Sequence, residues 1–190
     1  MSFLQLPYTE GDIKKNLGGV RGTMARPAGG SLCLTQAQVE ALHQVRQAVS
    51  EADVVWAITG STAFAIRGLD TVAHDIDLQT DAVGAYAIQR LLAPYMMRPV
   101  RYRISHNIRS HFGRAMIAGV IVEIIGSIEK RKADGTWAAA PNLSALIDWI
   151  SWDGNIWPVL ALDYEASAYH ALGRHGVANR LEAWITDHAL

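Results

Sequence analysis

A short apolar run that ends abruptly at a glycine–serine pair constrains the fold of this chain more than any other feature. Residues 54–58 read Val-Val-Trp-Ala-Ile, which is typical of a buried strand because β-branched and aromatic residues pack well in sheets. Gly60 and Ser61 follow, and residues 62–67 have the composition of a helix that Gly68 ends. A strand that turns directly into a helix leaves backbone N–H groups without partners, and glycine lets an anion approach them. The segment therefore predicts an anion-binding turn, although such a pair is also common in ordinary turns.

Two aspartates stand one residue apart in the next segment, which alternates polar and apolar side chains. Asp75 and Asp77 alternate with Ile76 and Leu78, the period-two pattern of a strand with one buried face. The two carboxylates then project from the same face, with Cα atoms about 7 Å apart. Carboxylates this close repel each other unless a cation lies between them, and oxygen ligands suit Mg²⁺ or Mn²⁺. The alternative is a polar strand end in which Asp77 or Asp81 caps the next helix.

A third carboxylate interrupts the second strand of a predicted hairpin. Residues 112–117 and 120–125 are apolar runs joined by an Ala-Gly pair, which indicates a β-hairpin. Glu123 lies inside the second run, where burying an unpaired charge is costly. A metal ion held by the two aspartates would remove that cost, which predicts that Glu123 is a third ligand. Two alternatives stay open: the strand has one solvated face, or Arg114 pairs with Glu123 across the hairpin.

Together, these motifs resemble the nucleotidyltransferase superfamily, which includes DNA polymerase beta and the antibiotic nucleotidyltransferases. The resemblance rests on Gly60-Ser61, on Asp75-x-Asp77 and on the later acidic residue Glu123. It implies an α+β fold in which a short mixed β-sheet is packed by helices and followed by a C-terminal helical appendix. It also implies that Asp75, Asp77 and Glu123 ligate catalytic Mg²⁺ or Mn²⁺, although the superfamily more often has aspartate at the third position. Gly60 and Ser61 would hold the triphosphate, and we include Arg67 as a candidate nucleotide-binding residue.

Further stretches resemble a branch of small, mostly uncharacterised prokaryotic nucleotidyltransferase-like proteins. These are His111-Phe112-Gly113-Arg114, residues 122–126 and the late stretch from Leu162 to Arg174, so that the similarity covers about residues 54–184. The resemblance implies a metal-dependent enzyme that moves a nucleoside monophosphate from a nucleoside triphosphate to a hydroxyl acceptor and releases pyrophosphate. The motifs do not fix the acceptor, which can be an RNA, a protein or a small molecule.

Two further functions are compatible with the same residues. One is a catalytically silent module that binds a nucleotide or a partner with the same fold, for which the glutamate at position 123 leaves room. The second is a phosphatase of the haloacid type, because Asp75-Ile76-Asp77 also fits an Asp-x-Asp nucleophile motif. We discount it, because that motif requires threonine or valine at the position of Gln79 and an apolar strand where residues 70–74 read Asp-Thr-Val-Ala-His.

Charge is nearly balanced over the chain, but arginine is concentrated in one region. With 17 basic and 18 acidic residues, the net charge of −1 does not indicate a general nucleic-acid-binding protein. Guanidinium groups nevertheless suit phosphates, so a local cluster is expected to bind a triphosphate or an RNA acceptor, or else to guard a solvated sheet edge. Within this cluster, Arg101 and Arg103 would share one strand face. Its members lie just before and within the predicted hairpin: Arg98, Arg101, Arg103, Arg109 and Arg114.

We expect the chain to have three parts. They are an irregular N-terminal arm over residues 1–34, the nucleotidyltransferase core over 35–140 and the C-terminal helical appendix over 141–190. The arm is expected from its glycines and prolines, and it is given no chemistry. In the other two parts, the residue patterns predict a strand over 100–105 and helices over 35–51, 80–92 with Thr80 as the cap, 143–150, 162–172 and 177–188.

The composition also bears on cellular context. Cys33 is the single cysteine, which excludes an intrachain disulfide and fits a reducing cytoplasm. No apolar stretch reaches the roughly 18 residues of a membrane-spanning helix, and the start lacks a signal-peptide pattern. We therefore expect a cytoplasmic protein without membrane association, for which a homodimer is a possible assembly.

Overall fold

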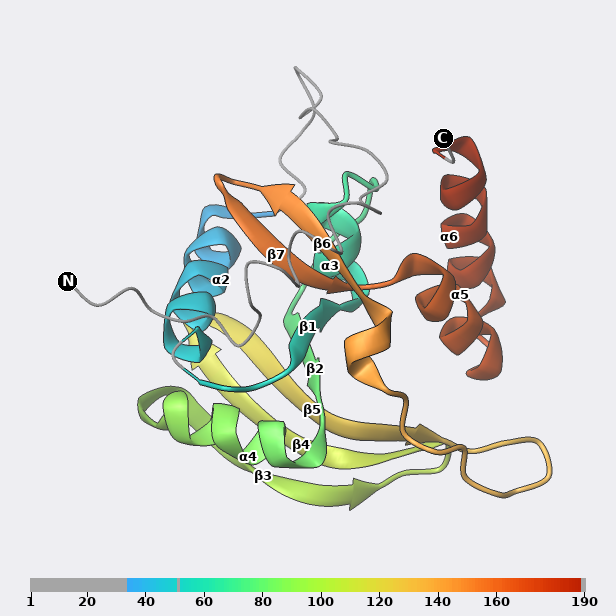
Figure 1. The fold of residues 1–190 in the computed structure, drawn as a ribbon, viewed down its shortest axis with the longest axis horizontal. Coiled ribbons are helices and arrows are strands. Elements are labelled where there is room, and N and C mark those ends of the chain that lie inside the picture. Colours follow the sequence, from blue (N-terminus) through green and yellow to red (C-terminus); the bar gives the residue numbers. More distant parts are fainter. Residues whose placement is uncertain (1–33, 51, 189–190) are drawn as a thin grey trace.

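The computed structural model, which describes residues 34–50 and 52–188, is built on a seven-stranded mixed β-sheet (Figure 1). The strands lie in the order β3-β4-β5-β2-β1-β7-β6. β2 runs antiparallel to β1 and parallel to β5, β7 runs parallel to β1, and the outer pairs are antiparallel. The strands are β1 (Trp56–Thr59), β2 (Ile76–Thr80), β3 (Met96–Ile104), β4 (Ile108–Ile117), β5 (Val120–Lys130), β6 (Ile147–Trp152) and β7 (Asn155–Leu160). The expected α+β fold with a mixed sheet is thus confirmed.

Two of the helices begin at residues whose side chains cap them. The Thr35 hydroxyl accepts a hydrogen bond from the Gln38 N–H, and the Gln38 carboxamide accepts one from the Thr35 N–H, which completes a capping box for α2. Asp81 caps α4 by accepting from the Gly84 N–H. The helices are α2 (Gln36–Val49), α3 (Gly60–Ile66), α4 (Ala82–Leu91), α5 (Leu162–Ala171) and α6 (His175–Asp187), with 3-10 turns η1 (Ala93–Tyr95) and η2 (Leu143–Leu146).

Helices cover both faces of the sheet. Because successive residues of a strand point to opposite faces, their alternation decides which side chains face which set of helices. On one face, fully buried residues such as Ile76, Leu78 and Ile124 form the main core with α2 and α4. On the other face, α5 and α6 pack with α3 around a smaller core that includes Phe64 and Leu181. In Figure 1, α2 and α4 lie to one side of the sheet, and α5 and α6 lie to the other. The acidic residues that alternate with the buried ones therefore face the second side.

Two predicted elements are wrong. Thr80 does not cap α4, because it is the last residue of β2 and its hydroxyl donates to the Val55 carbonyl. The segment 143–150 is not a helix but a single 3-10 turn followed by β6, which pairs with β7 through a hairpin. The turn of that hairpin, Asp153-Gly154, has positive φ angles at both residues, as tight hairpin turns require.

The division of the chain into an arm, a core and a helical appendix stays a prediction, but the sheet extends into the expected appendix. Residues 147–160 of the expected helical appendix add two strands to the sheet, so its helices begin only at Leu162. The arm expected over residues 1–34 lies outside the described residues except for Leu34, which is buried in the main core. Among the helices that the structure describes, none combines the length and the apolar character needed to cross a membrane.

Gly126 of β5 marks a close approach of α4 to the sheet. A Cβ atom there would lie 2.6 Å from the Ala85 Cβ and 2.7 Å from the Asp81 carbonyl oxygen. We expect Gly126→Ala to lower the free energy of unfolding by about 1–3 kcal/mol, because the backbone of α4 must move away. Urea denaturation measures the change, with Gly176→Ala as the control, since a Cβ at Gly176 would meet nothing within 4 Å. An unchanged midpoint for Gly126→Ala would contradict this packing.

Candidate active site

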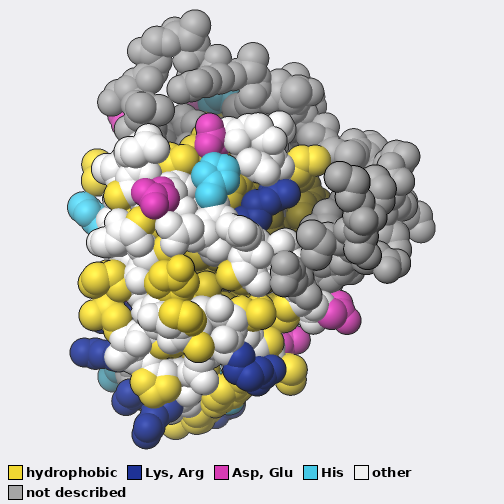
Figure 2. Space-filling model, turned by 90° about the vertical axis from the view of Figure 1, so that its left-hand side faces the viewer, with side chains coloured by type: hydrophobic (Ala, Val, Ile, Leu, Met, Phe, Trp, Pro, Cys, Tyr) yellow, Lys and Arg dark blue, Asp and Glu magenta, His cyan; other side chains and the backbone are white. Residues whose placement is uncertain are grey.

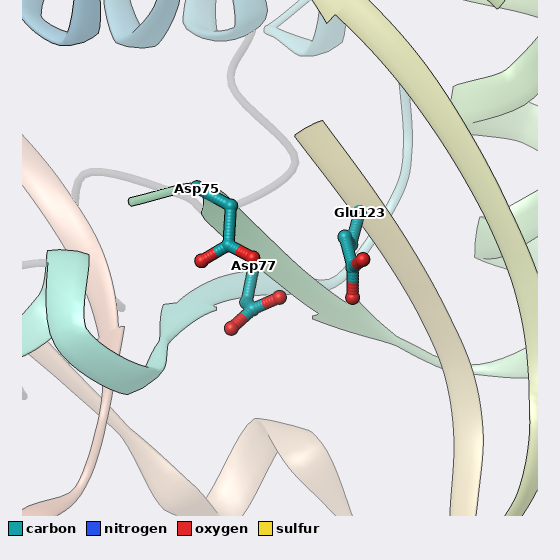
Figure 3. A group of neighbouring side chains, drawn as sticks. All are labelled: Asp75, Asp77 and Glu123. Carbon is teal, nitrogen blue, oxygen red and sulfur yellow. The ribbon is translucent and has the colours of Figure 1, made fainter. Parts of the chain in front are cut away.

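The structure places the three predicted acidic residues beside one another (Figure 3). Asp75 immediately precedes β2, Asp77 lies within β2, and Glu123 lies on the neighbouring strand β5. The parallel register pairs Asp77 directly with Glu123. One carboxylate oxygen from each of the three residues lies within 4.8 Å of the other two. The backbone of Asp75 is held by Thr62 of α3, whose hydroxyl donates to the Asp75 carbonyl at 2.6 Å.

The electrostatics of this group are dominated by Asp77. Burial, followed by the charges of Asp75 and Glu123, raises the pKa of the Asp77 carboxyl to about 8, while the Arg114 guanidinium opposes the rise. The repulsion between these carboxylates is removed either when one of them takes up a proton or when a cation binds between them. Its donors are all carboxylate oxygens, which fit Mg²⁺ or Mn²⁺ better than zinc. The three residues present therefore fit the divalent metal that the sequence predicted.

The turn from β1 into α3 lies against the same carboxylates. α3 begins at Gly60, two residues earlier than the sequence predicted. Gly60 has a φ of +68°, and a Cβ there would lie 2.9 Å from Asp77 Oδ2, so that only glycine fits between the turn and Asp77. Ser61 is half-buried, and its hydroxyl has no hydrogen-bond partner among the described residues. The turn thus presents an uncommitted hydroxyl one residue beyond the contact with Asp77.

A fourth acidic residue, Glu165 of α5, supports this turn from the opposite side. Its Oε1 accepts hydrogen bonds from the Thr59 hydroxyl at 2.6 Å and from the Gly60 N–H at 2.9 Å. Burial raises the pKa of Glu165, and these two hydrogen bonds partly oppose that rise. Glu165 was not among the residues predicted for the site. A signal was present, because Glu165 shares a helix face with the apolar residues Leu162 and Ala166, which predicts a buried carboxylate.

Tyr169, one helical turn after Glu165, is also directed to the site. Its hydroxyl lies 3.9 Å from the position that a Cβ on Gly60 would take. Burial, together with the nearby charge of Glu165, raises the pKa of Tyr169 to about 12, although Arg174, whose guanidinium lies 4.7 Å above the ring, opposes the rise. Tyr169 is therefore a neutral hydroxyl at neutral pH, able to donate a hydrogen bond beside the carboxylates.

Arg114 pairs with Glu123, which was one of the alternatives for this carboxylate. The Arg114 Nε and Nη2 atoms lie 2.7 Å and 2.6 Å from Glu123 Oε1 across the β4–β5 pair. The ion pair and the carboxylate group exist together, because Glu123 contributes an oxygen to both. Glu123 is thus neutralised from the β4 side while it faces Asp77 on the β2 side.

Arg67 is not placed with the carboxylates. Its buried guanidinium donates through Nη2 to Asp148 Oδ2 at 2.7 Å and to the Leu160 carbonyl at 2.9 Å. These contacts join the end of α3 to β6 and β7. The role that the structure gives Arg67 is therefore to anchor α3, and no contact supports its predicted role in binding the nucleotide.

Comparison with known proteins places the chain among nucleotidyltransferases. The family model of aminoglycoside-2''-adenylyltransferase matches residues 41–183. The crystal structure of a candidate nucleotidyltransferase from Thermotoga maritima is 38% identical, with a TM-score of 0.69 over 78% of this chain and 92% of that chain. The solution structure of the antibiotic-resistance factor ANT(2'')-Ia has the same fold at 17% identity, with a TM-score of 0.51 over 78% of this chain and 83% of that chain. No curated protein sequence matches the chain.

The resemblance inferred from the motifs is confirmed at the level of the superfamily. The segment that matches the family model includes all seven strands described above and the residues of the acidic group. The Thermotoga maritima structure extends the agreement to the fold of most of the chain. The chain belongs to the aminoglycoside-2''-adenylyltransferase family of nucleotidyltransferases.

Proposed function

We propose that this protein is a metal-dependent nucleotidyltransferase that transfers a nucleoside monophosphate from a nucleoside triphosphate to a hydroxyl acceptor, with release of pyrophosphate. Its family and the related Thermotoga maritima structure support nucleotidyl transfer itself. The metal dependence rests on one observation, the meeting of Asp75, Asp77 and Glu123 beside the Gly60 turn. Acidic side chains drawn from two strands and a loop into one half-buried position need a cation to be ionised together.

The protein's own contribution is to hold these groups in place before a ligand binds. The register of β2 with β5 sets Asp77 beside Glu123, and Thr62 fixes the backbone of Asp75. Mg²⁺ or Mn²⁺ held by the three carboxylates would neutralise triphosphate charge and lower the pKa of the acceptor hydroxyl. Because Asp77 and Glu123 sit on paired strands and Thr62 holds the backbone of Asp75 at the start of β2, the fold sets the geometry of the three carboxylates.

The triphosphate is assigned to Ser61 rather than to the Gly60 N–H. The Gly60 N–H already donates to Glu165. The Ser61 hydroxyl is uncommitted among the described residues, and the first N–H groups of α3 have no partner within the helix. Gly60 would then act through its lack of a side chain, which brings the turn close to Asp77.

Binding of a nucleoside triphosphate is expected to require the metal. Each of the four triphosphates is titrated by calorimetry in MgCl₂ and again in EDTA, and at least one should bind only with Mg²⁺. Asp77→Asn should weaken that binding by at least about tenfold, because it removes the central carboxylate. Asp53→Asn, at an exposed aspartate outside the site, is the matched control. Equal affinity in MgCl₂ and EDTA would refute the metal dependence.

The raised pKa of Asp77 predicts a pH-dependent stability in the metal-free protein. Between its ordinary pKa and about 8, the folded state holds a proton that the unfolded state has released. The stabilising contribution is therefore complete below the ordinary pKa and is lost as the pH rises through about 8. Urea denaturation in EDTA at several pH values should show this fall, and Asp77→Asn should flatten it. Identical slopes for both proteins would show that Asp77 is not the titrating group.

Glu165 is expected to position the turn that holds the triphosphate. Glu165→Ala leaves the Thr59 hydroxyl and the Gly60 N–H buried without a partner, which should cost about 1–3 kcal/mol of stability and raise the KM for the triphosphate. Glu165→Gln retains an accepting oxygen, so its KM should stay near that of the wild type. A KM that rises equally in both variants would instead assign the effect to the charge of Glu165.

A further inference from the structure

A continuous row of paired residues crosses the sheet from the phosphate turn to the far edge. Thr59 of β1 pairs with Asp77 of β2, and Asp77 pairs with Glu123 of β5. Glu123 pairs in turn with Arg114 of β4, and Arg114 pairs with Arg98 of β3. Residues paired across neighbouring strands point to the same face of a sheet. The row therefore places the triphosphate turn at one end, the carboxylates in the middle and arginines at the other end.

The basic end of this row continues along β3. Arg101 pairs with Phe112, and Arg103 pairs with Ser110. Because Ser110 and Phe112 alternate with the residues between them on β4, both arginines lie on the face that Arg114 occupies. Arg98, Arg101 and Arg103 are exposed, and within the described part of the chain none has an ion-pair partner. The nearby Arg109 differs, because Glu129 neutralises it at 2.5 Å.

These arginines lie too far from Ser61 to serve the same triphosphate. β3 lies four strands from β1, which corresponds to about 19 Å across the sheet. Arg101 and Arg103 also lie further along β3 than Arg98, so they are displaced from the row that contains the carboxylates. With the nucleotide at β1 and the carboxylates on β2 and β5, the side left for the acceptor is the face of β4 and β3. The acceptor surface is consequently cationic.

The same face offers an aromatic surface between the arginines. Phe112 is half-buried, and the Arg114 guanidinium lies 5.4 Å from its ring centroid. Arg101 and Arg103 are about 7 Å apart on one face of the strand, so they can contact successive phosphates of an extended backbone. Arginines that follow a backbone, with an aromatic ring on which a base stacks, are the features that single-stranded nucleic-acid sites combine.

The charge of this face also bears on the class of acceptor. Aminoglycosides carry several ammonium groups, which unpaired arginines would repel. A polyanion is attracted by the same residues even though the chain as a whole has a net charge of −1. Figure 2 views the opposite face of the sheet, on the side of α2 and α4, where Lys and Arg side chains are scattered over the lower half among hydrophobic ones.

From this geometry we infer that the acceptor is the 3′-terminal hydroxyl of a single-stranded nucleic acid whose backbone lies along Arg98, Arg101 and Arg103. The inference rests on the proposed nucleotidyl transfer. The 3′ oxygen forms a bond to the α-phosphorus, and the bond from that phosphorus to the oxygen bridging to the β-phosphate breaks. Pyrophosphate leaves with the electron pair of that bond. The hydroxyl proton passes to one of the three carboxylates and then to water.

Binding is tested with a fluorescein-labelled 12-nucleotide single strand, as RNA and as DNA, by fluorescence anisotropy at several salt concentrations. Arg101→Ala/Arg103→Ala should weaken binding of at least one strand by about tenfold or more and reduce the salt slope by about 1.4, since two phosphate contacts are lost. Arg90→Glu is the control, because it changes the net charge equally at an exposed arginine of α4 and should leave the affinity within about twofold. Equal weakening in both proteins, or no binding by the wild type, would overturn the inference.

Transfer is tested with α-³²P-labelled triphosphates and the same strands with free or phosphate-blocked 3′ ends. We expect label only on the strand with a free 3′ end, and less label with Arg101→Ala/Arg103→Ala. Label on a small molecule or on a protein, with none on either strand, would overturn the inference. Calorimetry of the wild-type protein with Mg²⁺ and triphosphate separates the two levels. Triphosphate binding without labelling of either strand rejects this acceptor only, whereas no triphosphate binding rejects the proposed function itself.

Discussion

The register of β2 with β5 is the constraint on which the rest of the site depends. It aligns Asp77 with Glu123 on one face, while Ile76, Leu78 and Ile124 enter the main core on the other. Slipping the pairing by one residue would turn a carboxylate into that apolar core, which is far more costly than the repulsion between the two acids. Burial of the apolar residues therefore supplies the free energy that holds like charges together. Any cation that binds there meets carboxylates whose strand positions the fold has already set.

The C-terminal helices are tied to this assembly by one buried side chain. Glu165 reaches from α5 to the Thr59 hydroxyl and the Gly60 N–H, so α5 holds the turn that lies beside Asp77. Phe64 of α3 packs in the same small core as α5 and α6. A displacement of α5 would consequently move the phosphate turn as well. The helical pair is therefore part of the site rather than an accessory to it.

The sequence predicted those helices and strands whose patterns lie within a few neighbouring residues. The alternation around Asp77 and the helical pattern over residues 35–51 each depend on residues a few positions apart, and both elements form close to the predicted bounds. β6 was missed because a six-residue edge strand has no internal signal that distinguishes it from a short helix. Glu165 and Arg67 find their partners roughly 80 to 106 residues away along the chain, and only the folded topology brings those partners close.

Arg114 connects the two halves of the proposed chemistry. It forms an ion pair with Glu123 and also opposes the rise in the pKa of Asp77, so it offsets part of the negative charge at the carboxylates. A positive charge at this position competes with a metal ion for Glu123, which is the feature that most favours a silent nucleotide-binding module. The same guanidinium lies over Phe112 and begins the arginine row that leads to β3.

A phosphate of an acceptor bound along that row would attract Arg114 away from Glu123. Acceptor binding and release of the third carboxylate would then be one event, and a site that is weak towards metal alone would become complete when both substrates are present.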